Sequence, residues 1–221
     1  QRFLSGVYKP VMDDWFLYGD LYKGISNRLA NFAIPNEKFA IRPLAGVFDC
    51  FVNAPLFNHL WIVELFLTFS LLFGSFLIIK ALRRNNFASG GFFLCLVCLF
   101  PVGLEATYWI AAATRVAYSL LFIGCATLSL DYCYKSDKVK FLVMFAVFGM
   151  LSVCFYEPAI VVYIILTLFI VWNNYKNKKD LLPLAIMAAH IAIIGIYYIL
   201  NSGSGEIESR GGFLETDIWE H

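Results

Sequence analysis

Long apolar stretches separated by short polar segments dominate the chain after residue 58. A transmembrane helix needs about 20 consecutive, predominantly apolar residues. Four stretches come close to that length: 60–79, 87–104, 108–130 and 181–200. The pattern predicts an all-α protein, a polytopic bundle in which these stretches are membrane-crossing helices.

A fifth apolar stretch, 141–172, is interrupted by Tyr156-Glu157-Pro158. One straight helix of this length would measure about 48 Å, which is too long for a hydrocarbon core of about 30 Å. Proline disfavours helical backbone at the preceding residue, so we expect a break at Glu157. Because basic residues flank both ends of the stretch, the chain is expected to cross and return. The sequence thus predicts a hairpin with its tip at Glu157 and six spans in total.

Lysine and arginine are concentrated in alternate loops between the predicted spans. Three short loops hold nine of the 17 basic residues, namely Lys80, Arg83, Arg84, Lys135, Lys138, Lys140, Lys176, Lys178 and Lys179. The turns near Glu105 and Glu157 hold none. Loops rich in Lys and Arg stay in the cytoplasm. We therefore expect residues 1–58, the two glutamate turns and the tail 201–221 on the extracytoplasmic side.

Segment 1–58 mixes aromatic residues, charges and prolines, and it is not itself a predicted span. We interpret it as an extracytoplasmic loop with one or two helices lying along the membrane interface. A bundle of about six helices, 59–200, and an extracytoplasmic loop or tail, 201–221, complete the predicted organisation. Because the chain begins at Gln1 rather than Met, we expect it to be a piece of a longer protein.

Composition narrows the class of protein further. Hydrophobic residues make up 60% of the chain, against about 45–50% in a soluble domain. The net charge of +1 gives no electrostatic reason to expect a nucleic-acid partner.

Cys95 and Cys98 form a CxxC without a second ligand pair, so we interpret them as membrane packing rather than a metal or redox site. For His190, in the middle of a predicted span, we expect a hydrogen bond across helices. Phosphate-loop, HExxH and GxSxG motifs are absent from the sequence.

Two adjacent carboxylates, Asp13 and Asp14, stand in the stretch VMDDW. Such a pair can act as a general base or bind a divalent metal ion. Mutual repulsion also favours retention of a proton on one of them. The alternative interpretation is two solvated acids that cap a helix beginning near Trp15, because Asp is a favoured N-cap.

Arg42 in AIRPLAG and Arg115 near the start of a predicted span are candidate anion-binding residues. The planar guanidinium offers paired donors that suit a phosphate. Arg42 could instead contact a lipid headgroup. Arg115 could instead form a structural salt bridge with Glu105 or Glu157, because charge inside hydrocarbon needs a partner.

The order, spacing and expected sidedness of VMDDW, IRPL and the tip motif FYEPA resemble the GT-C superfamily of membrane glycosyltransferases. The likeness is to bacterial members related to serotype-converting phage glucosyltransferases and other cell-envelope sugar transferases. It covers most of the chain. Members of that family carry a membrane helix before the acidic motif and further spans after those predicted here.

The resemblance implies a sugar donor carried on a polyprenyl phosphate, a cell-envelope glycan or lipid as acceptor, and an active site on the extracytoplasmic face of the bacterial cytoplasmic (inner) membrane. Asp13 or Asp14 would deprotonate the acceptor hydroxyl, and attack at the anomeric carbon would expel the lipid phosphate. The implied substrate-binding residues are Arg42, Arg115, Glu105, Tyr156 and Glu157. No cofactor is implied as certain, although a divalent metal is compatible with the acidic pair.

Two other functions fit the same pattern. In a transporter or flippase-like protein, Arg115, Glu105 and Glu157 would line a substrate path. In a non-catalytic membrane subunit, none of these residues would do chemistry. A transporter predicts that charges deep in the spans matter most, whereas a transferase predicts that the outer loop matters most.

Overall fold

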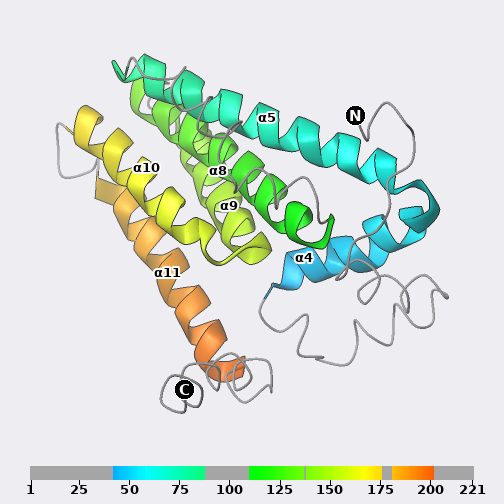
Figure 1. The fold of residues 1–221 in the computed structure, drawn as a ribbon. Coiled ribbons are helices and arrows are strands. Elements are labelled where there is room, and N and C mark those ends of the chain that lie inside the picture. Colours follow the sequence, from blue (N-terminus) through cyan, green and yellow to red (C-terminus); the bar gives the residue numbers. More distant parts are fainter. Residues whose placement is uncertain (1–41, 88–109, 137, 176–180, 202–221) are drawn as a thin grey trace, which may run out of the picture.

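The structure is a computed structural model that describes residues 42–87, 110–136, 138–175 and 181–201 (Figure 1). The regular elements in these ranges are all helices, and no described residue lies in a strand. The all-α prediction is therefore confirmed for this part of the chain. Most of the predicted span 87–104 and of segment 1–58 falls outside the described residues.

The two longest helices, α5 (Leu60–Arg84) and α8 (Ile110–Ser136), pack against each other. Each contains a stretch long and apolar enough to cross a membrane, Trp61–Arg84 in the first and Ala112–Ser136 in the second. Both helices run past the predicted ends at residues 79 and 130. The added turns carry Lys and Arg, which are good helix formers and are favourable at a helix C-terminus.

Glycine allows α5 and α8 to approach closely. A Cβ atom added to Gly124 would lie 2.5 Å from the carbonyl oxygen of Gly74. A Cβ added to Gly74 would lie 2.7 Å from the Cα atom of Leu121. Small residues at a helix interface let backbones meet in this way, which is a common arrangement in membrane bundles. The contact fixes how α5 and α8 lie relative to each other.

The predicted hairpin is present as α9 (Val139–Phe155) and α10 (Ala159–Asn174). Between them, Tyr156 has extended backbone with φ −154° and ψ 108°, and Pro158 precedes the first residue of α10. The helix break expected at Glu157 is confirmed. The physical cause is the one that the sequence suggested, because Pro158 can begin a helix but disfavours helical backbone before it.

Polar contacts between helices join the hairpin to α11 (Leu182–Asn201). The hydroxyl of Tyr163 on α10 lies 3.1 Å from Nδ1 of His190 on α11, and both side chains are buried. The hydrogen bond across helices expected for His190 is confirmed. Gly149 on α9 leaves room for the Tyr163 ring, since a Cβ there would lie 2.6 Å from the hydroxyl oxygen.

A short helical segment precedes α5 and consists of α4 (Pro43–Phe48), the π-helix η1 (Asp49–Asn53) and the 3-10 helix η2 (Ala54–His59). Phe48 anchors this segment. Its ring centroid lies 4.8 Å from that of Tyr118 on α8 and 5.0 Å from that of Phe155 on α9. Aromatic pairs at these separations add to the energy of area burial. The segment before α5 is thus held against the last turn of α9.

The bundle has two chemically distinct ends. Helices α5, α8 and α10 finish on one side, while α4 and the α9–α10 turn lie on the other (Figure 1). The first side is called the Asp131 end and consists of Arg84, Asn85, Asp131, Lys135 and Asn174. The second is called the Glu157 end and consists of Arg42, Asp49, Asn53, Thr114, Arg115, Tyr156 and Glu157.

Candidate functional site

At the Glu157 end, an ion pair joins residues 115 positions apart in the chain. Nε of Arg42 donates to Oε2 of Glu157 at 2.5 Å, and Nη2 of Arg42 donates to Oε1. The Arg42 guanidinium also lies 5.1 Å from the centroid of the Tyr156 ring. Paired donors on a planar carboxylate make a strong, oriented contact, and the aromatic face adds a cation–π attraction. Arg42 therefore contacts two residues of the α9–α10 turn, Tyr156 and Glu157.

Local sequence explains why Arg42 can reach the turn. It immediately precedes α4, whose first residue is Pro43, and its side chain makes no capping hydrogen bond to that helix. Proline suits the first helical position because its missing N–H would have no intrahelical partner there. Phe48 packs α4 against Phe155, which is the last residue of α9. The helix start and the turn are thereby brought together.

A second polar group at this end is buried between η1 and α8. Asp49, Asn53 and Thr114 are each at most 2% exposed. The Asn53 amide donates to Oδ1 of Asp49 at 3.1 Å and to the Thr114 hydroxyl at 2.9 Å. The π-helical turn of η1 contains both Asp49 and Asn53. Such turns are rare and are frequently found at functional sites.

Arg115 extends this buried group but is incompletely paired. Its Nη2 atom lies 4.0 Å from Oδ2 of Asp49, and its side chain is 21% exposed. Its buried Nε atom finds no hydrogen-bond acceptor in the described part of the chain. A buried donor without a partner is costly, and in native structures it calls for an explanation such as a catalytic role or a bound ion or water. Arg115 is thus suited to receive an anion.

The sequence predictions for the site have mixed outcomes. Arg42, Tyr156 and Glu157 lie together, and Arg115 lies at the same end of the bundle. For the alternative structural salt bridge of Arg115 with Glu105 or Glu157, the described ion pair of Arg115 is with Asp49, whereas Glu157 pairs with Arg42, and Glu105 lies outside the described residues. The catalytic candidates and one of the substrate-binding candidates lie outside the described residues: Asp13, Asp14 and Glu105.

Sequence reasoning missed Asp49, Asn53 and Thr114. One signal was available, because Asp49 stands in the largely apolar stretch GVFDCFVN and Asn53 follows four residues later on the same helical face. The partner Thr114 is 61 residues away from Asn53 in sequence. It could not be inferred without knowing how η1 packs on α8.

The described ranges offer no ready-made metal site. No group of three or more His, Cys, Asp and Glu side chains is placed there to hold a metal ion. The acidic pair at residues 13 and 14, for which a divalent metal is compatible, falls outside these ranges.

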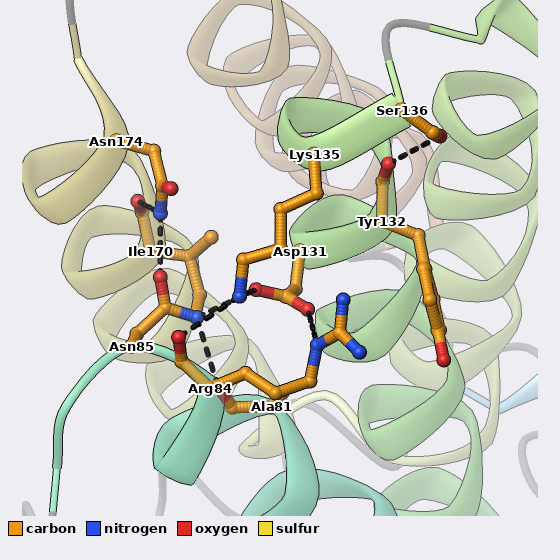
Figure 2. A network of polar contacts seen from close by, with 9 residues as sticks. All are labelled: Ala81, Arg84, Asn85, Asp131, Tyr132, Lys135, Ser136, Ile170 and Asn174. Carbon is orange, nitrogen blue, oxygen red and sulfur yellow. Dashed lines mark hydrogen bonds and ion pairs between the residues drawn. The ribbon is translucent and has the colours of Figure 1, made fainter.

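The Asp131 end contains the other polar network (Figure 2). The carboxylate of Asp131 is fully buried. It accepts hydrogen bonds from Arg84 Nε at 2.5 Å and from the Asn85 amide at 2.8 Å, and Lys135 Nζ lies at 2.7 Å. Both carboxylate oxygens are therefore engaged, and the charge is compensated by two cations.

This network also provides hydrogen-bond donors for backbone carbonyls at the C-terminal ends of α5 and α10. Lys135 donates to the backbone carbonyl of Arg84 at 2.9 Å, and Asn85 donates to that of Ala81 at 2.8 Å. Asn174 donates to the Asn85 side chain at 2.6 Å and to the carbonyl of Ile170 at 2.8 Å (Figure 2). Cations and amide donors at helix C-termini satisfy carbonyls that have no intrahelical partner. The Asp131 end therefore holds the C-terminal ends of α5, α8 and α10 together.

An open groove of about 700 Å³ lies between α10 and α11. Its described lining is entirely apolar or aromatic and includes Phe169, Trp172 and Leu184. A charged substrate would find no ionic partner among these side chains. The Glu157 end, with two arginines and two carboxylates, is the better candidate site.

No family model, no curated protein and no solved structure matches this chain.

Proposed function

We propose that the chain is part of an integral membrane sugar transferase that takes a sugar from a polyprenyl phosphate on the extracytoplasmic side of a bacterial cytoplasmic membrane. The observation that carries the proposal is the grouping of Arg42, Arg115, Tyr156 and Glu157 at one end of an apolar helical bundle. A lipid-linked phosphate must meet its enzyme at the membrane surface, and guanidinium groups are suited to bind it there.

Exposed apolar side chains support placement of the whole bundle in a membrane. Phe66 and Phe69 on α5 are 57% and 62% exposed, and Ile165 on α10 is 59% exposed. Helices α9 and α11 carry similar residues on their exposed faces. In contrast, polar residues such as Ser75, Thr114 and Asp131 are buried. A soluble monomer rarely exposes apolar surface so extensively, whereas lipid covers it without cost.

Two tryptophans support the same placement. Trp61 begins the apolar part of α5 near the Glu157 end, and Trp172 lies in the last turn of α10 near the Asp131 end. They are 41% and 86% exposed. Tryptophan is enriched at both membrane–water interfaces, where its ring sits at the level of the headgroups.

Charge supports the orientation. Lys80, Arg83, Lys138 and Lys140 are exposed near the ends of helices on the Asp131 side. Basic residues next to membrane helices favour the cytoplasm. With the Asp131 end inside, the Glu157 end faces outward, where polyprenyl-linked sugars would be used according to the resemblance in sequence.

The proposed chemistry divides the work between acids and arginines. Asp13 or Asp14 accepts the proton of the acceptor hydroxyl as its oxygen attacks the anomeric carbon. The bond between that carbon and the phosphate oxygen breaks, and the phosphate leaves with the electron pair. Arg42 and Arg115 stabilise the charge that builds on the leaving phosphate, an effect typically worth about 3–4 kcal/mol for one well-placed donor.

Transfer of radiolabelled sugar from polyprenyl-phosphate donors tests the proposal, with the full protein in bacterial membranes. We expect Asp13→Asn and Asp14→Asn to lower transfer by about 10²–10⁴-fold, because the amide cannot accept the proton. Expression should not change. Asp137→Asn, in a predicted cytoplasmic loop, is the matched control and should retain full transfer. Full activity in both single variants and in the double variant would eliminate the catalytic assignment.

A transporter or flippase-like activity is the second candidate, and the buried group Asp49, Asn53 and Thr114 with the partly buried Arg115 beside it favours it. Intramembrane charges commonly mark substrate paths. Movement of a fluorescent polyprenyl-phosphate lipid across proteoliposome membranes separates the two functions. A transporter would move the lipid and lose that activity on Asp49→Asn, while Asp13→Asn would leave it intact. A transferase would show the opposite sensitivity in the sugar-transfer assay.

A further inference from the structure

The planar donor edge of Arg42, with which it would bind a phosphate under the proposed function, is occupied by Glu157 in this structure. Two guanidinium nitrogens of Arg42 contact the two carboxylate oxygens of Glu157. The side chains are only 14% and 21% exposed, and Tyr156 lies against the guanidinium face. A carboxylate bound in this way uses the same planar pair of donors that a phosphate would use. Glu157 and a phosphate therefore compete for one position.

We propose that Glu157 competes with the lipid phosphate for Arg42. After sugar transfer, Glu157 pairs with Arg42 again and so promotes release of the polyprenyl-phosphate product. This role rests on the proposed function, in which Arg42 binds the phosphate of the lipid carrier. It assigns to Glu157 the control of how tightly donor and product are held, rather than a direct contact with the sugar.

Charge determines how strongly the Glu157 carboxylate competes with the phosphate at each stage of the reaction. The sugar donor is a phosphodiester with one negative charge, which equals the charge on the Glu157 carboxylate. When the bond to the anomeric carbon breaks, the phosphate becomes a monoester with a charge of about −1.5 to −2. Arg42 therefore favours phosphate over Glu157 most strongly as transfer occurs. The product keeps this extra charge and would be held tightly by Arg42, so the competing carboxylate of Glu157 is needed to weaken its binding and shorten the time that it remains bound.

The geometry of the turn allows Glu157 to leave Arg42 without disturbing the bundle. Phe155 and Ala159, which end α9 and begin α10, are 1% and 8% exposed and are packed in place. Only Tyr156, Glu157 and Pro158 lie between them, outside both helices. A change in the Glu157 rotamer would break its two contacts with Arg42 while α9 and α10 stay in place. The exchange therefore requires no rearrangement of helices.

Equilibrium binding of polyprenyl phosphate to the protein in nanodiscs measures this competition directly. If Glu157 holds Arg42 for about 90% of the time, then Glu157→Gln should lower the apparent Kd by about tenfold. Glu157→Asp keeps the charge on a shorter side chain and should bind the lipid more weakly than Glu157→Gln. In the transfer assay, Glu157→Gln should show stronger inhibition by added polyprenyl phosphate.

Glu64→Gln is the matched control, because it removes the same charge from a partly buried glutamate near the start of α5. It should leave the Kd within about twofold, below the tenfold change expected from freeing Arg42. A similar tightening in Glu64→Gln would attribute the effect to general electrostatics and overturn the proposal. Unchanged or weaker binding by Glu157→Gln would also overturn it and would make the Arg42–Glu157 pair a structural tie.

Two further arms separate the proposal from the function on which it rests. In the Arg42→Gln background, adding Glu157→Gln should not change the Kd for polyprenyl phosphate, because the guanidinium for which Glu157 and the phosphate compete is gone. Uncharged polyprenol, inorganic phosphate and phosphatidic acid identify which part of the ligand is recognised. Failure of the wild-type protein to prefer polyprenyl phosphate over polyprenol would defeat the proposed function. A clear preference with an unchanged Kd in Glu157→Gln would defeat only the role of Glu157.

Discussion

Asp131 and Arg115 are both charged residues of α8, but they differ in how completely they are paired at the two ends of the bundle. The Asp131 carboxylate is fully buried and is contacted by Arg84, Asn85 and Lys135 within 2.8 Å. Arg115 lies 4.0 Å from Asp49, and its buried Nε has no acceptor among the described residues. One charge is saturated with partners, whereas the other retains a donor for something else.

The contrast distinguishes polar groups that hold the fold from polar groups available for a ligand. A buried network whose members are all satisfied makes the surrounding structure rigid. An unsatisfied donor carries a cost that a ligand, an ion or a water can remove. Stability should therefore depend mainly on the Asp131 end, and activity mainly on the Glu157 end. The following predictions test this division from the largest change in stability to the smallest.

Asp131→Ala should produce the largest loss, about 3 kcal/mol of unfolding free energy, because three donors lose a charged acceptor. This figure is below the sum of three separate bonds, since Arg84 and Lys135 are about one-third exposed and water replaces part of their contact. Denaturant unfolding in mixed micelles measures the change. Lys80→Ala, an exposed cation in the last two turns of α5, should have no measurable effect. Equal stability of the two variants would remove the contrast between the ends.

Gly124→Ala should cost about 2 kcal/mol, because the added methyl meets the backbone of α5 and cannot rotate away. The intrinsic preference of helices for Ala over Gly, about 1 kcal/mol, offsets only part of the strain. The change lies between the two ends and should weaken both of them. Gly195→Ala on α11 is the control, because a Cβ there meets nothing within 4 Å. It should be neutral or slightly stabilising in the same unfolding measurement.

The sequence predicted those parts of the fold that depend on local rules. Pro158 and the flanking lysines were enough to place the helix break at Glu157 and to expect two antiparallel helices around it. The ends of α5 and α8 were placed too early, because the basic residues were assigned to loops although they favour a helix C-terminus. Apolar periodicity identifies a helix, but it does not determine how far polar helix formers extend it.

The site was predictable only as far as sidedness could group its members. Arg42 and Glu157 were both expected outside, and they do form a pair. The sequence could not show that Arg115 would lie near Asp49, nor that Gly74 and Gly124 would meet. These contacts depend on the rotation of each helix about its axis. Helix rotation is determined by packing between distant segments and leaves little signal in a single sequence.

Tyr163→Phe should cost about 0.5–1 kcal/mol, as is typical of one hydrogen bond between membrane helices. The hydroxyl is lost from its contact with His190, while the ring remains packed beside Phe145. This residue belongs to neither end and provides a reference for a single satisfied bond. Tyr175→Phe removes the same group from a side chain that is 50% exposed and should not change thermal stability. A larger loss in Tyr163→Phe than in Asp131→Ala would place the main polar support in the middle of the bundle.

Among the four variants compared here, Arg115→Gln should change stability least and sugar transfer most. Its ion pair is long, its Nε is unsatisfied, and Asp49 keeps the hydrogen bond from Asn53, so we expect the unfolding free energy to stay within about 0.5 kcal/mol of wild type. Sugar transfer should fall by about 10²–10³-fold, the usual effect of losing one donor to a developing anion. Arg115→Lys keeps the charge without the paired donors and should recover only part of that loss. If Arg115→Gln instead lowers the unfolding free energy as much as Asp131→Ala does, then the polar groups at both ends mainly stabilise the fold. Normal stability with full transfer would remove Arg115 from the site and leave Arg42 as its anion-binding residue.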